Sequence, residues 1–381
     1  MDQLYIAGDL VIPNFFQINN INFSANYKPD PTGYEDEIQS IFASAELSWK
    51  NQLYLTVTGR NDWDSKLAFS KQKSFFYPSV GLSALLSEMV KLPEVISYAK
   101  IRGSYTVVAS SFDRFLTNPG YEYNSQTHNW ANPTVYPMDN MKPEKTKSWE
   151  IGLNLKFWGN RFYLDATYYR SNTLNQTFKV DIPSSSGYKQ AIVQAGNVQN
   201  QGIELALGFS DKWAGFGWSS NATFTLNRNK VKRLASGSVN PVTGEAIQMD
   251  EMNVGWLGKE NVAPRVILTE GGSMTDIYVY NQLTKDNNGN IKVDQNGNLG
   301  ITSSNTPVKV GNLDADFNLG LTNHFTYKGI DLGVVLSARV GGLAYSATQG
   351  ILDYYGVSET SATARDNGGI PINNGKVNAH K

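Results

Sequence analysis

Apolar and polar residues alternate over residues 148–157. Trp149, Ile151, Leu153, Leu155 and Phe157 interleave there with Ser148, Glu150, Gly152, Asn154 and Lys156. A period of two is typical of a β-strand with one apolar and one polar face. The same alternation recurs at 41–49, 162–168, 203–209 and 330–340. The chain is therefore predicted to consist mainly of strands that separate two environments.

Segments of this kind predict about ten strands. Their ranges are 38–49, 52–61, 75–86, 98–108, 146–157, 161–178, 192–209, 217–232, 314–327 and 330–343. Some are less regular than others, and Asn323 interrupts the apolar run from Phe317 to Phe325.

The connections between these strands alternate in length. Short ones lie at 50–51, 158–160, 211–216 and 328–329, whereas long ones lie at about 61–74, 109–145, 181–191, 233–313 and 344–381. Short turns at one end and long extracellular loops at the other are typical of an outer-membrane antiparallel β-barrel. A soluble β-sandwich or β-solenoid also alternates, but a Greek key does not require this regular change of loop length.

Aromatic residues support a transmembrane barrel. They make up 12% of the chain, while charged residues make up 18%, below the roughly 25% usual for soluble domains. Many aromatics flank the short turns, as the lower aromatic girdle of a barrel requires: Trp49, Phe157, Trp158, Trp213, Phe216, Trp218 and Tyr327. No stretch approaches the roughly 18 apolar residues of a membrane helix, so any membrane crossing is expected to use strands.

Charge and residue chemistry exclude several functions. With 33 Lys and Arg against 34 Asp and Glu, nothing favours a nucleic-acid partner. Cysteine is absent, and His128, His324 and His380 are scattered, so we expect no enzyme activity, no metal site and no cofactor. The segments 285–290 and 293–298 are similar to calcium loops but lack the required spacing, which favours Asn-Gly turns of successive hairpins.

Several stretches resemble a known family when they are taken together. They are Gly59-Arg60-Asn61-Asp62-Trp63, Phe75-Phe76-Tyr77-Pro78-Ser79-Val80-Gly81-Leu82-Ser83, Lys100-Ile101-Arg102-Gly103-Ser104-Tyr105, the segment from Lys142 to Leu153, and the segment from Ala195 to Leu205. In this order they are similar to the barrel of SusC/RagA-type TonB-dependent transporters, from about Leu4 to Pro371. The segment 270–280 departs from the family, which usually has glycine where Thr275 and Val279 stand.

The resemblance implies a barrel of the 22-stranded type with a plugged lumen. Residues 1–381 are then expected to form one partial barrel of about ten strands, without the plug domain and the TonB-binding segment. The resemblance further implies a multi-pass protein of the Gram-negative outer membrane, in contact with membrane lipid. It would import oligosaccharides or other large nutrients, with a SusD/RagB-like lipoprotein as lid and the TonB complex as energy source. The alternatives are a TonB-dependent peptide importer, a passive porin or adhesin barrel, and a soluble glycan-binding or glycan-cleaving β-protein.

Candidate ligand-binding residues lie in two of the long loops. Asn61, Asp62, Trp63 and Asp64 open the first loop, and Tyr121, Tyr123, Trp130 and Tyr136 belong to the second. Aromatic rings beside amides and carboxylates suit a sugar, because CH groups pack on the ring while hydroxyls need donors and acceptors. The alternative is that these residues pack the loops. The inward-facing Glu150, Glu204 and Arg339 are expected to line water or to contact a plug.

Overall fold

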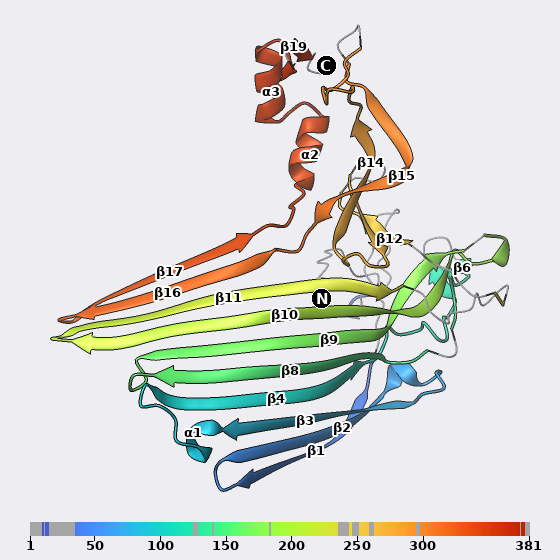
Figure 1. Ribbon diagram of the computed structural model, residues 1–381. Coiled ribbons are helices and arrows are strands. Elements are labelled where there is room, and N and C mark those ends of the chain that lie inside the picture. The colour runs from blue at the N-terminus through green and yellow to red at the C-terminus, as the bar shows by residue number, and fades with distance from the viewer. Residues whose placement is uncertain are drawn as a thin grey trace.

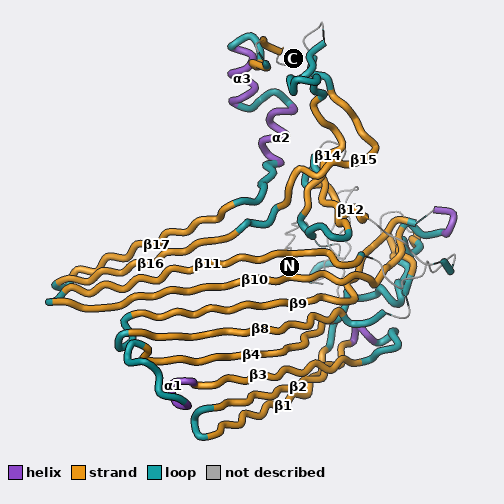
Figure 2. Tube along the Cα trace, viewed as in Figure 1, coloured by secondary structure: helices purple, strands orange, loops and turns teal. Residues whose placement is uncertain are grey.

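The computed structural model describes residues 10, 12–14, 35–124, 129–138, 141–182, 184–234, 244–245, 251–258, 263–294, 298–373 and 375–377. It is dominated by one large antiparallel sheet, with smaller elements gathered at one end (Figures 1 and 2). In the described part of the chain, no helix combines the length and hydrophobicity that crossing a membrane requires.

The large sheet contains all ten predicted strands. They are β1 (Ile38–Trp49), β2 (Leu53–Asp64), β3 (Ser74–Leu85), β4 (Ile96–Ser110), β8 (Glu144–Phe157), β9 (Phe162–Asp181), β10 (Gln190–Trp213), β11 (Phe216–Arg233), β16 (Phe317–Tyr327) and β17 (Ile330–Val340). They pair in this order, and the short β7 (Val135–Tyr136) pairs with β10 as an eleventh strand. The prediction of an all-β, antiparallel barrel wall is confirmed.

This wall is an open sheet and not a closed barrel. Within the described residues β1 pairs only with β2, and β17 pairs only with β16, so the two lie at opposite edges (Figure 1). A tight turn such as Lys50-Asn51 or Lys328-Gly329 joins neighbouring strands at one end. Lys50, Asn51 and Lys328 adopt positive φ, and this backbone conformation allows a turn of only two residues to reverse the chain direction.

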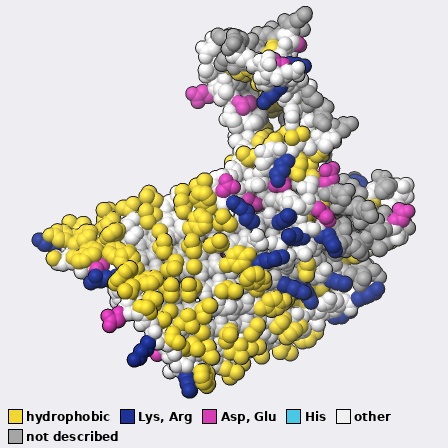
Figure 3. All heavy atoms as spheres, viewed as in Figure 1, with side chains coloured by type: hydrophobic (Ala, Val, Ile, Leu, Met, Phe, Trp, Pro, Cys, Tyr) yellow, Lys and Arg dark blue, Asp and Glu magenta, His cyan; other side chains and the backbone are white. Residues whose placement is uncertain are grey.

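Strand register places the predicted apolar residues on one face. Leu153 of β8 lies opposite Ala166 of β9, which lies opposite Leu205 of β10, followed by Phe224 of β11 and Leu319 of β16. We call the face that carries these residues the outward face and the opposite one the inward face. Figure 3 shows apolar side chains spread over the wall on one side of the molecule. Such a surface is unfavourable in water and suits lipid.

Five of the seven residues of the predicted lower girdle take part in a series of ring contacts at the short-turn end. Phe157 contacts Trp158, and the contacts continue through Phe162, Phe209, Trp213, Trp218 and Phe216 to Phe325, with ring centroids 4.7–6.4 Å apart. The indole N–H of Trp218 donates to Oδ1 of Asn323 at 3.2 Å. Asn323 is the one amide that interrupts the apolar run 317–325, and this bond provides it with a partner within the girdle.

The inward face carries polar networks. The Arg102 guanidinium donates to Asn154 Oδ1 at 2.6 Å, to Thr167 Oγ1 at 2.6 Å and to Asp165 Oδ1 at 3.1 Å. It lies across Gly152, where an added Cβ would come within 2.6 Å of Arg102 Nε. Gly152 is therefore required by the close approach of the arginine, and the network ties β4, β8 and β9 together.

Smaller elements occupy the other end of the wall. A second sheet contains β12 (Glu251–Trp256), β13 (Arg265–Thr269), β14 (Asp276–Leu283) and β15 (Ile301–Asn312). This end also contains two hairpins, β5 (Glu122–Asn124) with β6 (Asn129–Ala131) and β18 (Ile370–Ile372) with β19 (Gly375–Val377). It further contains the helices α2 (Ala347–Tyr354) and α3 (Glu359–Asp366) and the 3-10 turns at Ser65–Leu67 and Ser184–Ser186. The four-residue helix α1 (Leu86–Met89) lies instead at the turn between β3 and β4 (Figure 1).

Two apolar clusters attach the loop elements to the wall. One contains Leu67, Phe75, Phe112, Met141 and Ile192, and the other contains Val198, Val231, Leu234, Met252 and Leu268. Val198 and Val231 are on the inward face, so the second sheet packs against the inside of the wall at β10 and β11. Both clusters of the described chain lie at this end, whereas most of the remaining wall exposes its apolar residues outward.

The facing assignment predicts unequal effects of a charge on the two sides of the wall. Leu153→Arg places a guanidinium near the middle of the outward face and should cost roughly 2–4 kcal/mol in the free energy of unfolding. Thr225→Arg, on the inward face opposite Glu204, should cost far less. Denaturant unfolding of the complete barrel in lipid measures both effects. Equal losses would contradict the assignment.

Candidate functional site

The four candidate residues at the end of β2 do not form one site. Strand alternation puts Asn61 and Trp63 on the outward face and Asp62 and Asp64 on the inward face. Trp63 is exposed, whereas both carboxylates are buried. The aromatic ring and the acids therefore cannot contact the same small ligand from this strand.

The two buried carboxylates are engaged within the protein. Asp62 accepts hydrogen bonds from Arg60 Nε at 2.7 Å and from the Tyr77 hydroxyl at 2.6 Å. Asp64 accepts from the Lys66 backbone N–H at 2.9 Å, which caps the 3-10 turn Ser65–Leu67, and from the Ser111 hydroxyl. These contacts join β2 to β3 and to the end of β4, so both acids help to fix the loops.

The candidates in the second loop are in different surroundings. Tyr121 is exposed, and Trp130 on β6 is 67% exposed. Tyr123 lies opposite Trp130 in the β5–β6 register; its side chain lies outside the described residues. The Tyr136 ring packs edge-on against Tyr188 with centroids 5.1 Å apart, and its strand β7 pairs with β10. The structure thus brings Tyr123 and Trp130 together on one hairpin and places Tyr136 against the wall.

The segment from Glu270 to Asp276 anchors the second sheet. Asp276 is completely buried, and its Oδ2 accepts from Lys309 Nζ at 2.6 Å and from the Ser273 backbone N–H at 3.0 Å. The backbone N–H of Gly271 donates to the Val231 carbonyl at 2.7 Å, and that of Val231 donates to the Gly272 carbonyl at 2.8 Å. This turn therefore continues the hydrogen bonding of β11.

The segments that are similar to calcium loops each begin at an antiparallel bridge. Residues 285 and 291 form one antiparallel bridge, and residues 293 and 299 form a second. Asp286 Oδ1 accepts from the Asn290 and Asn288 backbone N–H groups, both at 2.8 Å, and Oδ2 accepts from the Asn290 amide at 3.1 Å. The Asn290 bonds are the main reason that the Asp286 pKa lies below its ordinary value. No group of three or more His, Asp or Glu residues that could hold a metal occurs in the described ranges.

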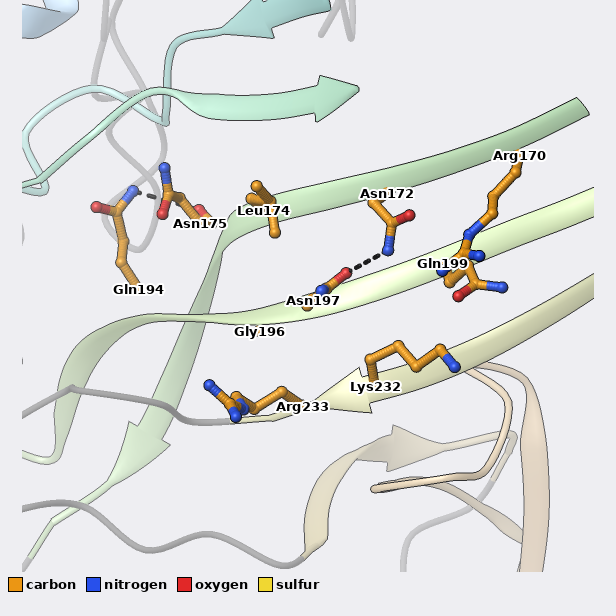
Figure 4. A pocket seen from close by; sticks show the side chains of 10 residues that line it. All are labelled: Arg170, Asn172, Leu174, Asn175, Gln194, Gly196, Asn197, Gln199, Lys232 and Arg233. Atoms are coloured by element: carbon orange, nitrogen blue, oxygen red, sulfur yellow. Dashed lines mark hydrogen bonds between the residues drawn. The ribbon is translucent and has the colours of Figure 1, made fainter. Parts of the chain in front are cut away.

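A cavity of about 510 Å³ lies between β9, β10 and the end of β11 (Figure 4). Its lining includes Arg170, Asn172, Gln199, Lys232 and Arg233, and the Asn172 amide donates to Asn197 Oδ1 at 2.7 Å. Arg170 and Asn172 have the same parity along β9 as Phe162, Leu164 and Ala166. The cavity therefore opens on the outward face, where the sequence analysis placed no ligand site.

Comparison with known proteins identifies the family. The family model described as "TonB dependent receptor-like, beta-barrel" matches residues 7–256. The chain belongs to this family of TonB-dependent receptor barrels. It is accordingly a β-barrel protein of the outer membrane, and the predicted relationship to SusC/RagA-type proteins is confirmed.

The alignments with individual relatives cover most of this receptor barrel but only part of each relative's own length. TonB-dependent receptor P3 of Formosa agariphila is 25% identical over 344 residues, covering 82% of this chain and 33% of the relative. TonB-dependent receptor SusC of Bacteroides thetaiotaomicron is 26% identical over 353 residues, covering 85% and 34%. The chain spans about a third of the length of these curated relatives.

A solved structure supports the fold. The RagAB peptide transporter structure aligns with a TM-score of 0.63 at 18% identity, over 80% of this chain and 34% of the matched chain. At this identity the similarity concerns the fold alone.

Substitution of Asp62 tests its role in the receptor barrel. Asp62→Ala should lower the free energy of unfolding by about 1–3 kcal/mol, because it removes the acceptor of the partly buried Tyr77 hydroxyl. Asp113→Ala, which removes an exposed carboxylate from a neighbouring loop, should change it by less than about 0.5 kcal/mol. Denaturant titration of the complete barrel in lipid measures the difference. If Asp62→Ala is as mild as the control, Asp62 is not a structural residue.

Proposed function

We propose that this receptor barrel is part of a TonB-dependent importer of oligosaccharides or other large nutrients. The observation that carries the proposal is the gathering of folded loop elements at one end of a wall that belongs to a receptor family. Long loops of bacterial barrels lie outside the cell, where a nutrient is first met. A passive pore does not require a second sheet packed against the inside of its wall.

The β5–β6 hairpin is the favoured ligand contact. It pairs with no other strand of the described chain, and it carries the exposed Trp130 in β6, with the exposed Tyr121 directly before β5. An exposed aromatic face can pack on a sugar ring or on a peptide side chain. Trp63, on the outward face, is a weaker candidate, and Asp62 and Asp64 act by fixing the loops. Tyr123 belongs to the same hairpin as Trp130 and stays a candidate for that reason.

A surface lipoprotein and the TonB complex complete the proposed system. The names of the relatives support this: one is called SusC, and the RagAB structure is described as a peptide transporter. By analogy, a SusD/RagB-like lipoprotein would close over the loops, and a TonB-driven movement of a plug would open the lumen. No covalent chemistry is needed. The RagAB likeness also makes a peptide importer the second candidate.

The importer proposal predicts separable effects of loop and wall changes. Replacement of residues 121–132 by a short Gly-Ser linker in the full-length protein should weaken uptake and leave membrane assembly intact, because this hairpin lies outside both apolar clusters. Trp130→Ala should weaken ligand binding by roughly 0.5–1.5 kcal/mol, by analogy with aromatic pairs. Trp158→Ala, a 56% exposed Trp at the short-turn end, is the matched control.

Growth on candidate glycans or peptides, with and without TonB, measures the outcome alongside surface levels of each variant. Growth that does not depend on TonB would indicate a passive pore. Growth that falls only in proportion to surface protein would mean that the hairpin aromatics are packing residues. Trp130→Ala and Trp158→Ala with equal effects would reject the hairpin as a binding site.

A further inference from the structure

Basic residues form a band on the outward face above the apolar wall. Three successive rows across β8, β9, β10 and β11 are Trp149-Arg170-Gln201-Arg228, Lys147-Asn172-Gln199-Lys230 and Lys145-Leu174-Asn197-Arg233. Lys or Arg occupies half of these positions, and no Asp or Glu is among them. Figure 3 shows Lys and Arg side chains gathered between the apolar area and the loop end.

The height of this band agrees with the headgroup level of the outer leaflet. Lys147 lies ten residues along β8 from Phe157 in the lower girdle. At about 3.4 Å per residue and a tilt of about 40°, the separation along the membrane normal is about 26 Å, close to the roughly 25 Å of an apolar barrel band. At the edge of the band that borders the apolar wall, the Trp149 and Tyr168 rings contact each other with centroids 5.4 Å apart, as expected at a membrane interface.

The outward cavity adds a specific binding feature to the band. Arg170, Lys232 and Arg233 supply positive charge to its lining. Gln199, which also lines it, is only 5% exposed, and within the described residues its Oε1 has no hydrogen-bond partner. A buried acceptor without a partner is costly, so this oxygen favours a ligand that brings a hydroxyl or N–H donor.

We propose that this cavity and the basic band bind the phosphate-bearing glycolipid headgroups of the outer leaflet. The Lys and Arg side chains match phosphate charge, the Gln199 oxygen matches a sugar hydroxyl, and the apolar wall directly below accommodates acyl chains. A lipid is the occupant because the cavity opens on the face that meets lipid. A soluble nutrient on its way to the lumen does not pass this face. The proposal depends on the membrane location of the barrel and not on which nutrient it imports.

Lipid titration of the full-length receptor tests the proposal. The triple variant Arg170→Gln, Lys230→Gln and Lys232→Gln should bind a phosphorylated outer-leaflet glycolipid at least tenfold more weakly, measured by native mass spectrometry after removal of endogenous lipid. The control Lys50→Gln, Lys212→Gln and Lys328→Gln removes three charges at the short-turn end and should bind within twofold of wild type. The charge-retaining variant Arg170→Lys, Lys230→Arg and Lys232→Arg should also bind, which separates lost charge from misfolding.

Two further binding measurements identify which groups of the lipid the site recognises. The dephosphorylated glycolipid should bind the wild type at least tenfold more weakly, and Gln199→Leu should weaken binding of both glycolipids severalfold. Equal affinity for phosphorylated and dephosphorylated lipid, or an unaffected triple variant, would overturn the proposal. Displacement of the lipid by millimolar inorganic phosphate would indicate a free-phosphate site instead, and selective capture of an acidic protein would indicate a protein interface.

Discussion

Hydrogen bonding of the backbone is the constraint on which this structure depends. In hydrocarbon no water replaces a missing partner, so a strand that crosses a membrane needs a neighbour on both sides. The eight inner strands of the wall meet this condition through long, nearly unbroken ladders, from the β1–β2 register to the β16–β17 register. Within the described residues, β1 and β17 each pair on one side alone, which leaves the backbone groups of their other edge available to a neighbouring strand.

The alternation of side chains follows from the same ladder. Once register is fixed, odd and even residues of each strand are assigned to lipid or to the inside, and a slip by one residue would exchange them. The Arg102 network and the ring contacts of the lower girdle are on opposite sides for this reason. Asn323 is the informative exception, because a neighbouring indole N–H makes an amide acceptable on the outward face.

The sequence allowed the wall to be predicted well because one rule governs every strand. The ten predicted ranges correspond to ten observed strands, with differences at their ends. The second sheet β12–β15 was not predicted, because it does not separate lipid from water: Met252 of β12 and Leu268 of β13 pack instead against Val198 and Val231 of the wall. The roles of side chains in the loops could not be predicted from the sequence either. The residues next to Asp62 in the sequence do not distinguish a buried, hydrogen-bonded carboxylate from an exposed ligand contact. That distinction depends on Tyr77, which comes from another strand.

The outward residues of a single strand meet different environments at different heights. On β8 the outward positions read Phe157, Leu155, Leu153, Ile151 and Trp149, and then Lys147 and Lys145. The face is the same, but the environment that it meets changes from the lower interface to hydrocarbon and then to headgroups. The period of two therefore fixes where a side chain points, and the height along the strand determines what it meets. Facing and height together describe the outward cavity, because Arg170 points away from the lumen and lies at the level where phosphate replaces hydrocarbon. A polar cavity at that height is better explained by the membrane than by the transported nutrient.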